Sequence, residues 1–281
     1  MKLHAELPDA ILQEFLPRCR SCYGLCCVAL ARSIPDGFPE TRLPGEPCSF
    51  LQPDFRCAIH AELSARGLFG CETYHCLGAG QMVSGLFPSG SWRLADSPDE
   101  AREIYRAFLL GEGLKLTLWY LAEAGTLLPV QELWARINRL LSKGLALCGF
   151  SREDFFLYDL EEYLLRAHSL LRQAWSMLRR QLSWKPRRRP PNCVGRCFQG
   201  WDTRGMNFSA SSLAQADFQG CDLWGANFLG ADIQGADFRG ADLSEALFLT
   251  PGQIGRTITD ETTRLPQALL FVWREDRRGL L

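Results

Sequence analysis

The sequence lacks any long uninterrupted apolar run. A membrane-spanning helix needs about 20 consecutive apolar residues, and the opening "MKLHAELPDAILQEF" carries acids and a proline where a secretory signal needs an apolar core. Net charge is also nearly absent, because 31 Lys and Arg stand against 32 Asp and Glu. No overall field therefore directs the chain to nucleic acid or anionic lipid. We expect a cytoplasmic protein that does not use a membrane.

Histidine is scarce, with four residues, whereas cysteine is abundant, with twelve. In a reducing compartment persistent disulfides are rare, so dense cysteine more often indicates metal binding or redox chemistry. The distribution is uneven, since two thirds of the cysteines fall in the first 76 residues. These eight are Cys19, Cys22, Cys26, Cys27, Cys48, Cys57, Cys71 and Cys76.

The stretch "CRSCYGLCC" holds four of these cysteines in nine residues. The spacing Cys19-x2-Cys22 is used by zinc sites and by iron–sulfur sites alike. Cys26 and Cys27 are adjacent, and adjacent side chains diverge, so either two sites share the motif or one of the pair is core. Eight thiols suffice for two four-thiolate sites, with His60 and His75 as substitutes for one or two of them.

Three other roles compete for these cysteines. They could pack as small buried hydrophobes, form a disulfide scaffold, or include a catalytic thiol activated by His60 or His75. No glycine-framed nucleophile turn accompanies any of them, and we assign no catalytic residue. A loop-rich segment with little apolar core needs a staple to offset its conformational entropy, which favours metal.

The cysteine segment resembles a known family. "CRSCYGLCC", "PCSFLQPDFRCAIH" and "GCETYHC" are similar to the bacterial cysteine-cluster family described as zinc- or iron-chelating domains, whose signature is CxxCxxCC. This chain has one extra residue, C-x2-C-x3-C-C. The resemblance implies that the eight cysteines bind zinc or iron, including the option of an iron–sulfur cluster. Relatives are also associated with protein methylation, so an iron–sulfur enzyme is one alternative.

The chain divides into several regions. Residues 1–81 form the cysteine-cluster domain, in which "AIHAELSARG" predicts a short helix ending at Gly67. A helical region over 97–184 begins at "SPDE", where Ser97 is an N-cap and Pro98 and Glu100 suit the first turn. Ser151 gives a second, weaker start signal. An apolar stripe at helical spacing follows, with His168 beside it as a core or boundary histidine: Leu160, Leu164, Leu171, Trp175, Leu178 and Leu182.

Residues 185–195 are a basic, proline-rich linker. Its basic cluster could neutralise phosphates, but no aromatic residues are interleaved for base stacking, so nucleic-acid binding is the less favoured role. The cluster consists of Lys185, Arg187, Arg188 and Arg189.

The region after the linker repeats every five residues. From residue 206 it is divided as MNFSA, SSLAQ, ADFQG, CDLWG, ANFLG, ADIQG, ADFRG, ADLSE and ALFLT. A period of five suits neither an α-helix nor a strand. A coil with four short faces satisfies it, with residues 20 apart stacked, so that Phe208 lies under Phe228 and Phe218 under Phe238.

These blocks resemble the pentapeptide-repeat family, whose repeat is A-(D/N)-L-x-x. The resemblance implies a right-handed quadrilateral β-helix over 196–250, extended back through "RCFQG" and "WDTRG", with 251–281 as a C-terminal cap. The expected fold is thus mixed: an irregular metal-stabilised domain, a helical middle and a short β-helical solenoid.

The most favoured function is binding or scaffolding of another protein, with a structural or redox-sensing metal. Some family members protect DNA gyrase as acidic, DNA-like rods, which is a second alternative. Here the array is too short for that role, because nine blocks make little more than two coils.

Overall fold

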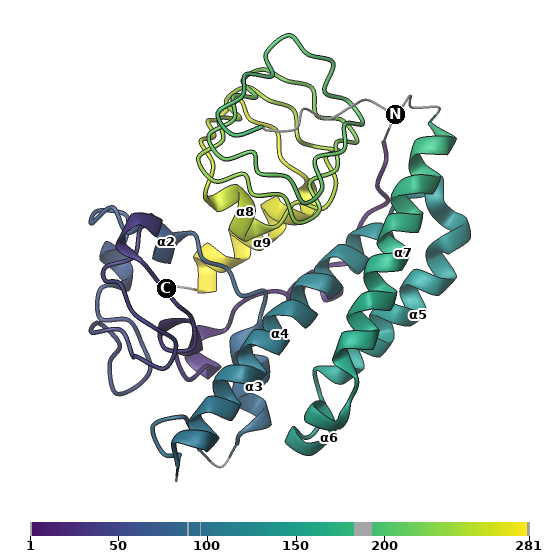
Figure 1. The fold of residues 1–281 in the computed structure, drawn as a ribbon. Coiled ribbons are helices and arrows are strands. Elements are labelled where there is room, and N and C mark those ends of the chain that lie inside the picture. Colours follow the sequence, from purple (N-terminus) through teal and green to yellow (C-terminus); the bar gives the residue numbers. More distant parts are fainter. Residues whose placement is uncertain (1, 89, 96, 183–192, 280–281) are drawn as a thin grey trace. The chain divides into compact units, whose positions relative to one another are not determined.

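The computed structural model describes residues 2–88, 90–95, 97–182 and 193–279 (Figure 1). The chain forms two compact units. Unit 1 comprises Met1–Gln13, Trp119–Leu140 and Ala167–Leu281, and unit 2 comprises Glu14–Leu118 and Leu141–Arg166. Among the described residues, no helix has the length and apolarity needed to cross a membrane. The predicted basic linker lies outside the described residues, except for its last three positions.

Short helical turns joined by loops make up the first part of the chain. The expected helix near Gly67 is reduced to a single 3-10 turn, η4, because the following residues only form turns before Gly67 takes a φ of +66°. The elements of this part are α1 (Asp9–Gln13), η1 (Cys19–Ser21), η2 (Leu25–Cys27), η3 (Ile34–Asp36), η4 (His60–Glu62), α2 (Phe69–Glu72) and α3 (Ala79–Leu86).

Two helices of the helical region begin where the capping residues predict. α4 (Pro98–Ala124) starts after Ser97, whose Oγ accepts the N–H of Glu100 at 3.2 Å. α6 (Arg152–Leu157) starts after Ser151, whose side chain accepts the N–H of Asp154. Each hydroxyl satisfies one of the backbone donors that a helix start leaves without a partner. The remaining elements of the helical region are η5 (Leu128–Val130), α5 (Gln131–Leu147) and α7 (Leu160–Gln181).

The apolar stripe of α7 is largely buried, as its helical spacing predicts. Leu171 and Leu178 are 1% and 0% exposed. Tyr163 and Ala167, which the stripe omits, are buried as well. His168 is exposed, so its assignment as a core or boundary histidine is wrong.

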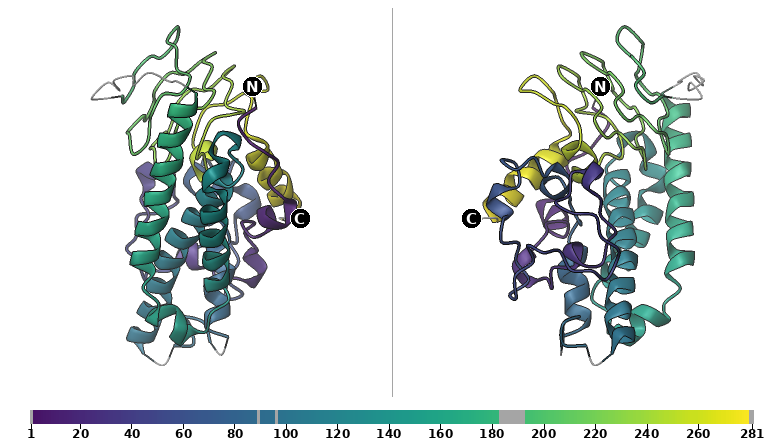
Figure 2. Two further views of the ribbon diagram at one scale, coloured as in Figure 1. Left: turned by 90° about the vertical axis from the view of Figure 1, so that its right-hand side faces the viewer. Right: turned by 60° about the vertical axis from the view of Figure 1, so that its left-hand side comes forward.

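The repeats wind the chain back over itself every 20 residues. Asn207 pairs with Asn227 in a parallel bridge, and Asp217 pairs with Asp237 in another. The rings of Phe218 and Phe238 stack 5.0 Å apart at 4°. One coil earlier, Phe198 stacks on Phe218 at 4.6 Å, which confirms that "RCFQG" belongs to the array. The successive coils are visible in Figure 2.

The predicted quadrilateral β-helix is nevertheless wrong. The described residues contain no β-strand and no sheet, and the coils are drawn without arrows in Figure 1. The coils are joined instead by isolated bridges. In most blocks the second residue pairs with its counterpart one coil away, and the chain then turns, so that each bridge stays isolated. The expected mixed fold with a β-helical part is therefore corrected to a fold of helices and of turns that are joined by isolated bridges.

Two features of each block produce these turns. The fifth residue has a positive φ from Gly195 to Gly240, a conformation in which glycine avoids the clash of a Cβ atom. The second residue, usually Asp or Asn, accepts the backbone N–H two positions later, as Asp217 does from Gln219 at 2.9 Å. These acids therefore stabilise their own turns.

The end of the coil in unit 1 is covered by the second part of α4. The Trp119 indole donates to the carbonyl of Leu249 at 2.8 Å, and Glu123 Oε1 accepts the N–H of Phe248 at 2.7 Å. Thr250 and Gln253 form a capping box at the start of α8 (Pro251–Gly255). A last helix, α9 (Gln267–Gly279), follows. Buried groups thus close the end that a repeat array would otherwise expose.

The N-terminal segment also belongs to the coil. Glu245 stands at the fifth position of its block, where the preceding blocks mostly carry glycine. Its Oε2 accepts the N–H groups of Leu3 at 2.8 Å and His4 at 3.3 Å. Leu3 is fully buried. The first residues of unit 1 are therefore held by one of its last blocks.

Candidate metal centre

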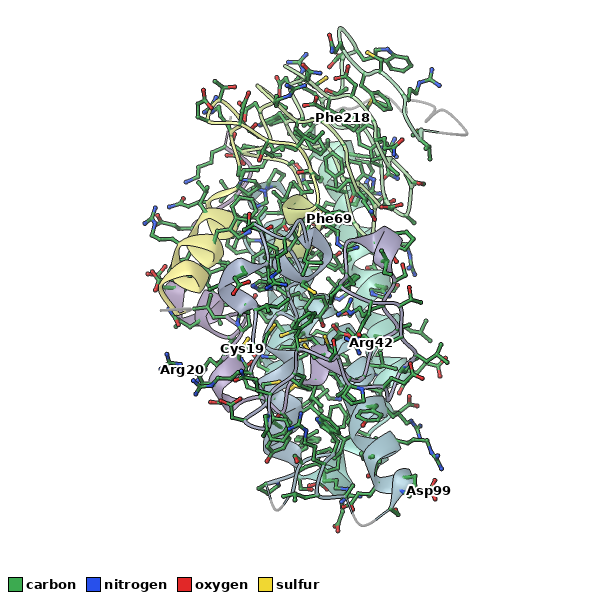
Figure 3. The ribbon with its side chains drawn as sticks, turned by 90° about the vertical axis from the view of Figure 1, so that its left-hand side faces the viewer. Cys19, Arg20, Arg42, Phe69, Asp99 and Phe218 are labelled. Carbon is green, nitrogen blue, oxygen red and sulfur yellow. The ribbon has the colours of Figure 1, made fainter. Side chains whose placement is uncertain are left out.

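All eight cysteines of the N-terminal cluster lie in unit 2 and are free thiols. Cys48 is buried, Cys19 is exposed, and the other six are half-buried. Cys26 and Cys27 follow each other in η2, yet their Sγ atoms are only 3.8 Å apart. The divergence expected of adjacent side chains does not hold here. In Figure 3, sulfur atoms appear among the loops between the labels of Cys19 and Arg42.

Four of the thiols accept hydrogen bonds from the backbone shortly after them in sequence. The N–H groups of Leu25 and Gly24 bond to Cys22, and those of Gly80 and Gly78 bond to Cys76. Cys48 and Cys57 accept in the same way from the N–H groups of Phe50 and Ile59. Burial raises the pKa of each of these thiols, and the amides oppose that rise. Amides aimed at sulfur favour the thiolate, which is the form that binds metal.

The thiols form two neighbouring groups. The first contains Cys22, Cys26 and Cys76. The pKa of Cys26 lies well above its usual value because its S–H donates to Cys27, because it is buried, and because Cys22 and Cys76 are near. The pKa of Cys76 is raised to about 11 by burial and by Cys22. Cys22 and Cys76 thus lie near enough to Cys26 to raise its pKa.

The second group contains Cys48, Cys57 and Cys71. Burial, together with the nearby thiols of Cys27, Cys48 and Cys57, raises the pKa of Cys71 to about 11. Burial first, and then Cys27, raises the pKa of both Cys48 and Cys57. Cys27 thus contributes to the raised pKa of all three thiols, as it does to those of Cys22 and Cys26.

Two arginines supply positive charge beside Cys27. Its pKa is lowered to about 7, first by the hydrogen bond from Cys26 and then by Arg42 and Arg32. Arg42 is only 8% exposed and donates to the carbonyls of Glu46 and Cys26. Arg32 lies over the rings of Phe38 and Tyr74. Within the described residues neither arginine forms an ion pair with a carboxylate. Both arginines also act on carboxylates, Arg42 on Glu40 and Arg32 on Glu112, so only part of their positive charge is directed at the thiols.

The side chains do not converge fully. In the part of the chain that the structure describes, no three His, Cys, Asp or Glu side chains are placed so that they could hold one metal ion. A Cβ atom on Gly80 would lie 2.6 Å from Cys22 Sγ and 3.9 Å from Cys76 Sγ. Two thiols thus share the space above this glycine.

The two histidines are placed less favourably. The Nδ1 atom of His75 accepts the N–H of Leu77 at 3.2 Å, so the neutral ring carries its proton on Nε2. That Nε2 is buried and makes no hydrogen bond within the described residues. As a protonated nitrogen it is a donor and offers no lone pair to a metal. His60 is exposed in η4. Ligation by either histidine stays a prediction.

The structure adds residues that the sequence motif does not single out. Arg32 and Arg42 belong to no sequence motif, and only the fold brings them near enough to lower the pKa of Cys27. Tyr74 donates to Glu112 of α4 beside the first group of thiols, and burial raises the pKa of both side chains. The sequence did contain one signal for the hydrogen bonds at sulfur, because Gly24 and Gly78 each follow a cysteine by two residues. In the structure both glycines have a positive φ.

Comparisons with known proteins concern the repeats above all. Residues 207–248 match the family described as pentapeptide repeats, in eight copies. A protein of Bacillus subtilis (strain 168), named "Uncharacterized protein YybG", is 32% identical over 182 residues. That match covers 64% of this chain and 64% of the relative's length. No solved structure matches the chain. The C-terminal part is thus similar to pentapeptide-repeat proteins, whereas the resemblance of the cysteine segment to a metal-chelating family stays a prediction.

Proposed function

We propose that unit 2 binds zinc or iron through its cysteine thiolates, and that unit 1 presents its repeat coil to a protein partner. The protein would then act as a binding or scaffold module with a metal-stabilised domain. The observation that carries the metal proposal is the set of backbone N–H groups aimed at Cys22, Cys48, Cys57 and Cys76. When bound, the metal supplies cross-links between loops that have little regular structure of their own.

Buried cysteines that pack as hydrophobes are the competing explanation. Such cysteines need neither amides at sulfur nor arginines beside them. Both features lower the free energy of a thiolate, and a hydrophobic thiol gains nothing from either. This contrast favours metal binding over simple packing.

Elemental analysis of anaerobically purified protein tests the proposal. We expect at least one equivalent of zinc or iron per chain, and Cys22→Ser should lower the metal content. The same variant should increase proteolysis within residues 1–81 and leave the repeats intact. Less than about 0.2 equivalents of any transition metal, together with a protease-resistant N-terminal third, would contradict metal stabilisation. Iron accompanied by inorganic sulfide would instead support the iron–sulfur alternative.

A matched pair of glycines in α3 separates metal binding from helix stability. Gly80→Ala places a methyl group against the sulfur atoms of Cys22 and Cys76, whereas a Cβ on Gly85 meets nothing within 4 Å. Alanine favours a helix over glycine at both positions. We expect Gly80→Ala to weaken metal binding and Gly85→Ala to leave it unchanged. Equal metal affinity in the two variants would show that Cys22 and Cys76 are not ligands.

A further inference from the structure

We propose that a row of aromatic rings in unit 2 binds an acidic peptide segment of a partner protein, with a carboxylate of the peptide on the guanidinium of Arg93. The inference depends neither on metal at the thiols nor on the repeat coil, and it gives the protein a second interaction surface. We call this surface the aromatic row. It consists of Tyr23, Phe55, Trp92, Arg93, Leu94 and Tyr105, all of which belong to unit 2.

The four rings of the aromatic row are half-buried and follow one another along the surface. The ring centroids of Tyr23 and Phe55 are 5.4 Å apart, those of Phe55 and Trp92 are 6.0 Å apart, and those of Trp92 and Tyr105 are 6.4 Å apart. The Trp92 indole donates to the carbonyl of Tyr23 at 2.8 Å, and the Tyr23 hydroxyl donates to the carbonyl of Phe87 at 3.2 Å. These bonds fix the rings before a partner binds, which lowers the entropy cost of binding.

Phe55 occupies a backbone position that suits glycine. Its φ is +66°, a left-handed conformation that costs energy for any residue with a Cβ atom. Two hydrogen bonds close the tight loop around it, from the N–H of Phe55 to the carbonyl of Gln52 at 3.0 Å and from the N–H of Gln52 to the carbonyl of Arg56 at 2.8 Å. Strained residues of this kind concentrate at ligand-binding sites. Glycine would remove the strain and the ring together, so the chain keeps a half-exposed ring at the cost of strain.

Arg93 gives the aromatic row its charge. Its guanidinium carbon lies 4.8 Å from the ring centroid of Phe55 and 4.9 Å from that of Trp92. The guanidinium also donates to the carbonyl of Leu51 at 3.3 Å, which uses one of its five N–H groups. Arg93 is exposed and forms no ion pair within the described residues. A planar guanidinium held on two rings therefore has donors left for a carboxylate.

The surroundings of Arg93 favour an acidic peptide over a nucleic acid. The guanidinium, and not a base, lies over Phe55 and Trp92, whereas single-stranded nucleic acid needs ring faces on which its bases can stack. A single unpaired guanidinium also suits one carboxylate better than a run of phosphates, because Arg56 is already paired with Asp54 at 3.6 Å. Leu94 is 74% exposed and offers an apolar contact to the neighbouring residue of a peptide.

An array of synthetic decapeptides tests the proposal on the full chain as purified. Each peptide carries Glu or Asp beside Leu or Phe, and a matched version has Gln or Asn in place of the acid. The strongest binders are then titrated by fluorescence anisotropy. We expect acidic peptides to bind at least about tenfold more tightly than their amides, which is about 1.4 kcal/mol. Their affinity should fall as salt is raised, because salt screens charges at the surface.

Variants locate the binding on the aromatic row. Arg93→Ala should weaken it at least about tenfold, and Arg93→Lys should also weaken it, because an ammonium group cannot form the paired hydrogen bonds of a guanidinium. Arg66→Ala is the matched control and should leave affinity unchanged, since Arg66 lies over the Phe50 ring at 5.9 Å but is paired with Glu62 at 2.6 Å. Phe55→Gly suits the positive φ, so it removes the ring without straining the loop and should weaken binding.

The comparison of acid and amide peptides uses the unaltered chain, so a misfolded variant would not prevent the test. No binding of any acidic peptide, equal binding of acid and amide versions, or unchanged affinity in Arg93→Ala would overturn the proposal. Tighter binding of a single-stranded oligothymidylate that displaces the peptides would overturn it as well, and so would self-association of the chain that is lost in Arg93→Ala. Metal content is measured separately, so the failure of this inference and the failure of metal binding are distinguishable.

Discussion

Phe228→Ala removes the middle ring of a buried column in the repeats. Phe228 is fully buried, and its ring stacks on that of Phe208 at 5.3 Å and 26°. The rings of Phe218 and Phe238 meet it edge-on at 6.3 Å and 6.1 Å. Ala226, two residues earlier, is also fully buried. The ring therefore has close aromatic neighbours in its own coil and in the coil before it.

The expected cost follows from these contacts. Truncating a buried phenylalanine to alanine typically costs about 3–5 kcal/mol, because the transfer free energy is lost and a cavity remains. Each aromatic pair adds about 0.5–1.5 kcal/mol beyond its buried area. The bridged coils on both sides limit how far the cavity can collapse. We therefore place Phe228→Ala in the upper half of the 3–5 kcal/mol range.

Hydrogen exchange of peptides from residues 206–250, measured in the full chain, reports the stability of the coil itself. The predicted loss of about 4–5 kcal/mol corresponds to exchange that is roughly 7 × 10² to 4 × 10³ times faster, since about 1.4 kcal/mol is a factor of ten. Phe228→Leu is the matched control, because Leu223 and Ile233 occupy the same block position. It should cost on the order of 1–2 kcal/mol. A loss below about 1 kcal/mol for Phe228→Ala would refute the packing argument.

Two further predictions concern unit 1. Burial raises the pKa of Glu123 to about 8, and the hydrogen bond from Phe248 opposes that rise. A carboxyl whose folded pKa is raised contributes most to stability below its usual pKa of 4.5. That contribution is lost as the pH rises to about 8, and it amounts to on the order of 5 kcal/mol at about 1.4 kcal/mol per unit. Glu123→Gln keeps an acceptor for Phe248 and should flatten the stability of the coil between pH 5 and pH 9 in urea titrations; an unchanged pH profile would mean that Glu123 is not buried as described. We also expect no potent inhibition or protection of DNA gyrase. About four coils at ~4.8 Å make a rod of only 15–20 Å, and acids such as Asp217 and Asp237 cap their own turns. Protection at stoichiometric protein in a supercoiling assay with a quinolone would disprove this.

The repeats show how far sequence reasoning reaches. The period of five predicts the buried third residue of each block and the 20-residue spacing of Phe218 and Phe238, and both are confirmed. It does not predict whether the backbone pairs long enough to form strands. That depends on how early each block turns, and the turn is set by the hydrogen bond of its second residue and the positive φ of its fifth.

The surroundings of the cysteines were less predictable. The motif indicates thiolate chemistry at Cys22 and Cys26, but the neighbours of Cys27 come from loops 20 to 45 residues further on. Spacing along the sequence carries no information on which distant loops meet. Nothing in the sequence marks Arg42, and only its burial in the fold brings its charge near enough to lower the pKa of Cys27.

The hydrogen bonds from Leu3 and His4 to Glu245 have a consequence for synthesis on the ribosome. The two ends of this contact are 242 residues apart, and a ribosome adding 5–20 residues per second needs about 12–50 s to pass from one to the other. Unit 2 leaves the ribosome completely within that interval, since its last residue is Arg166. The buried leucine at position 3 must therefore wait, exposed, until the late blocks emerge. Nascent chains stalled before residue 245 should bind chaperones at their first residues, whereas longer ones should release them.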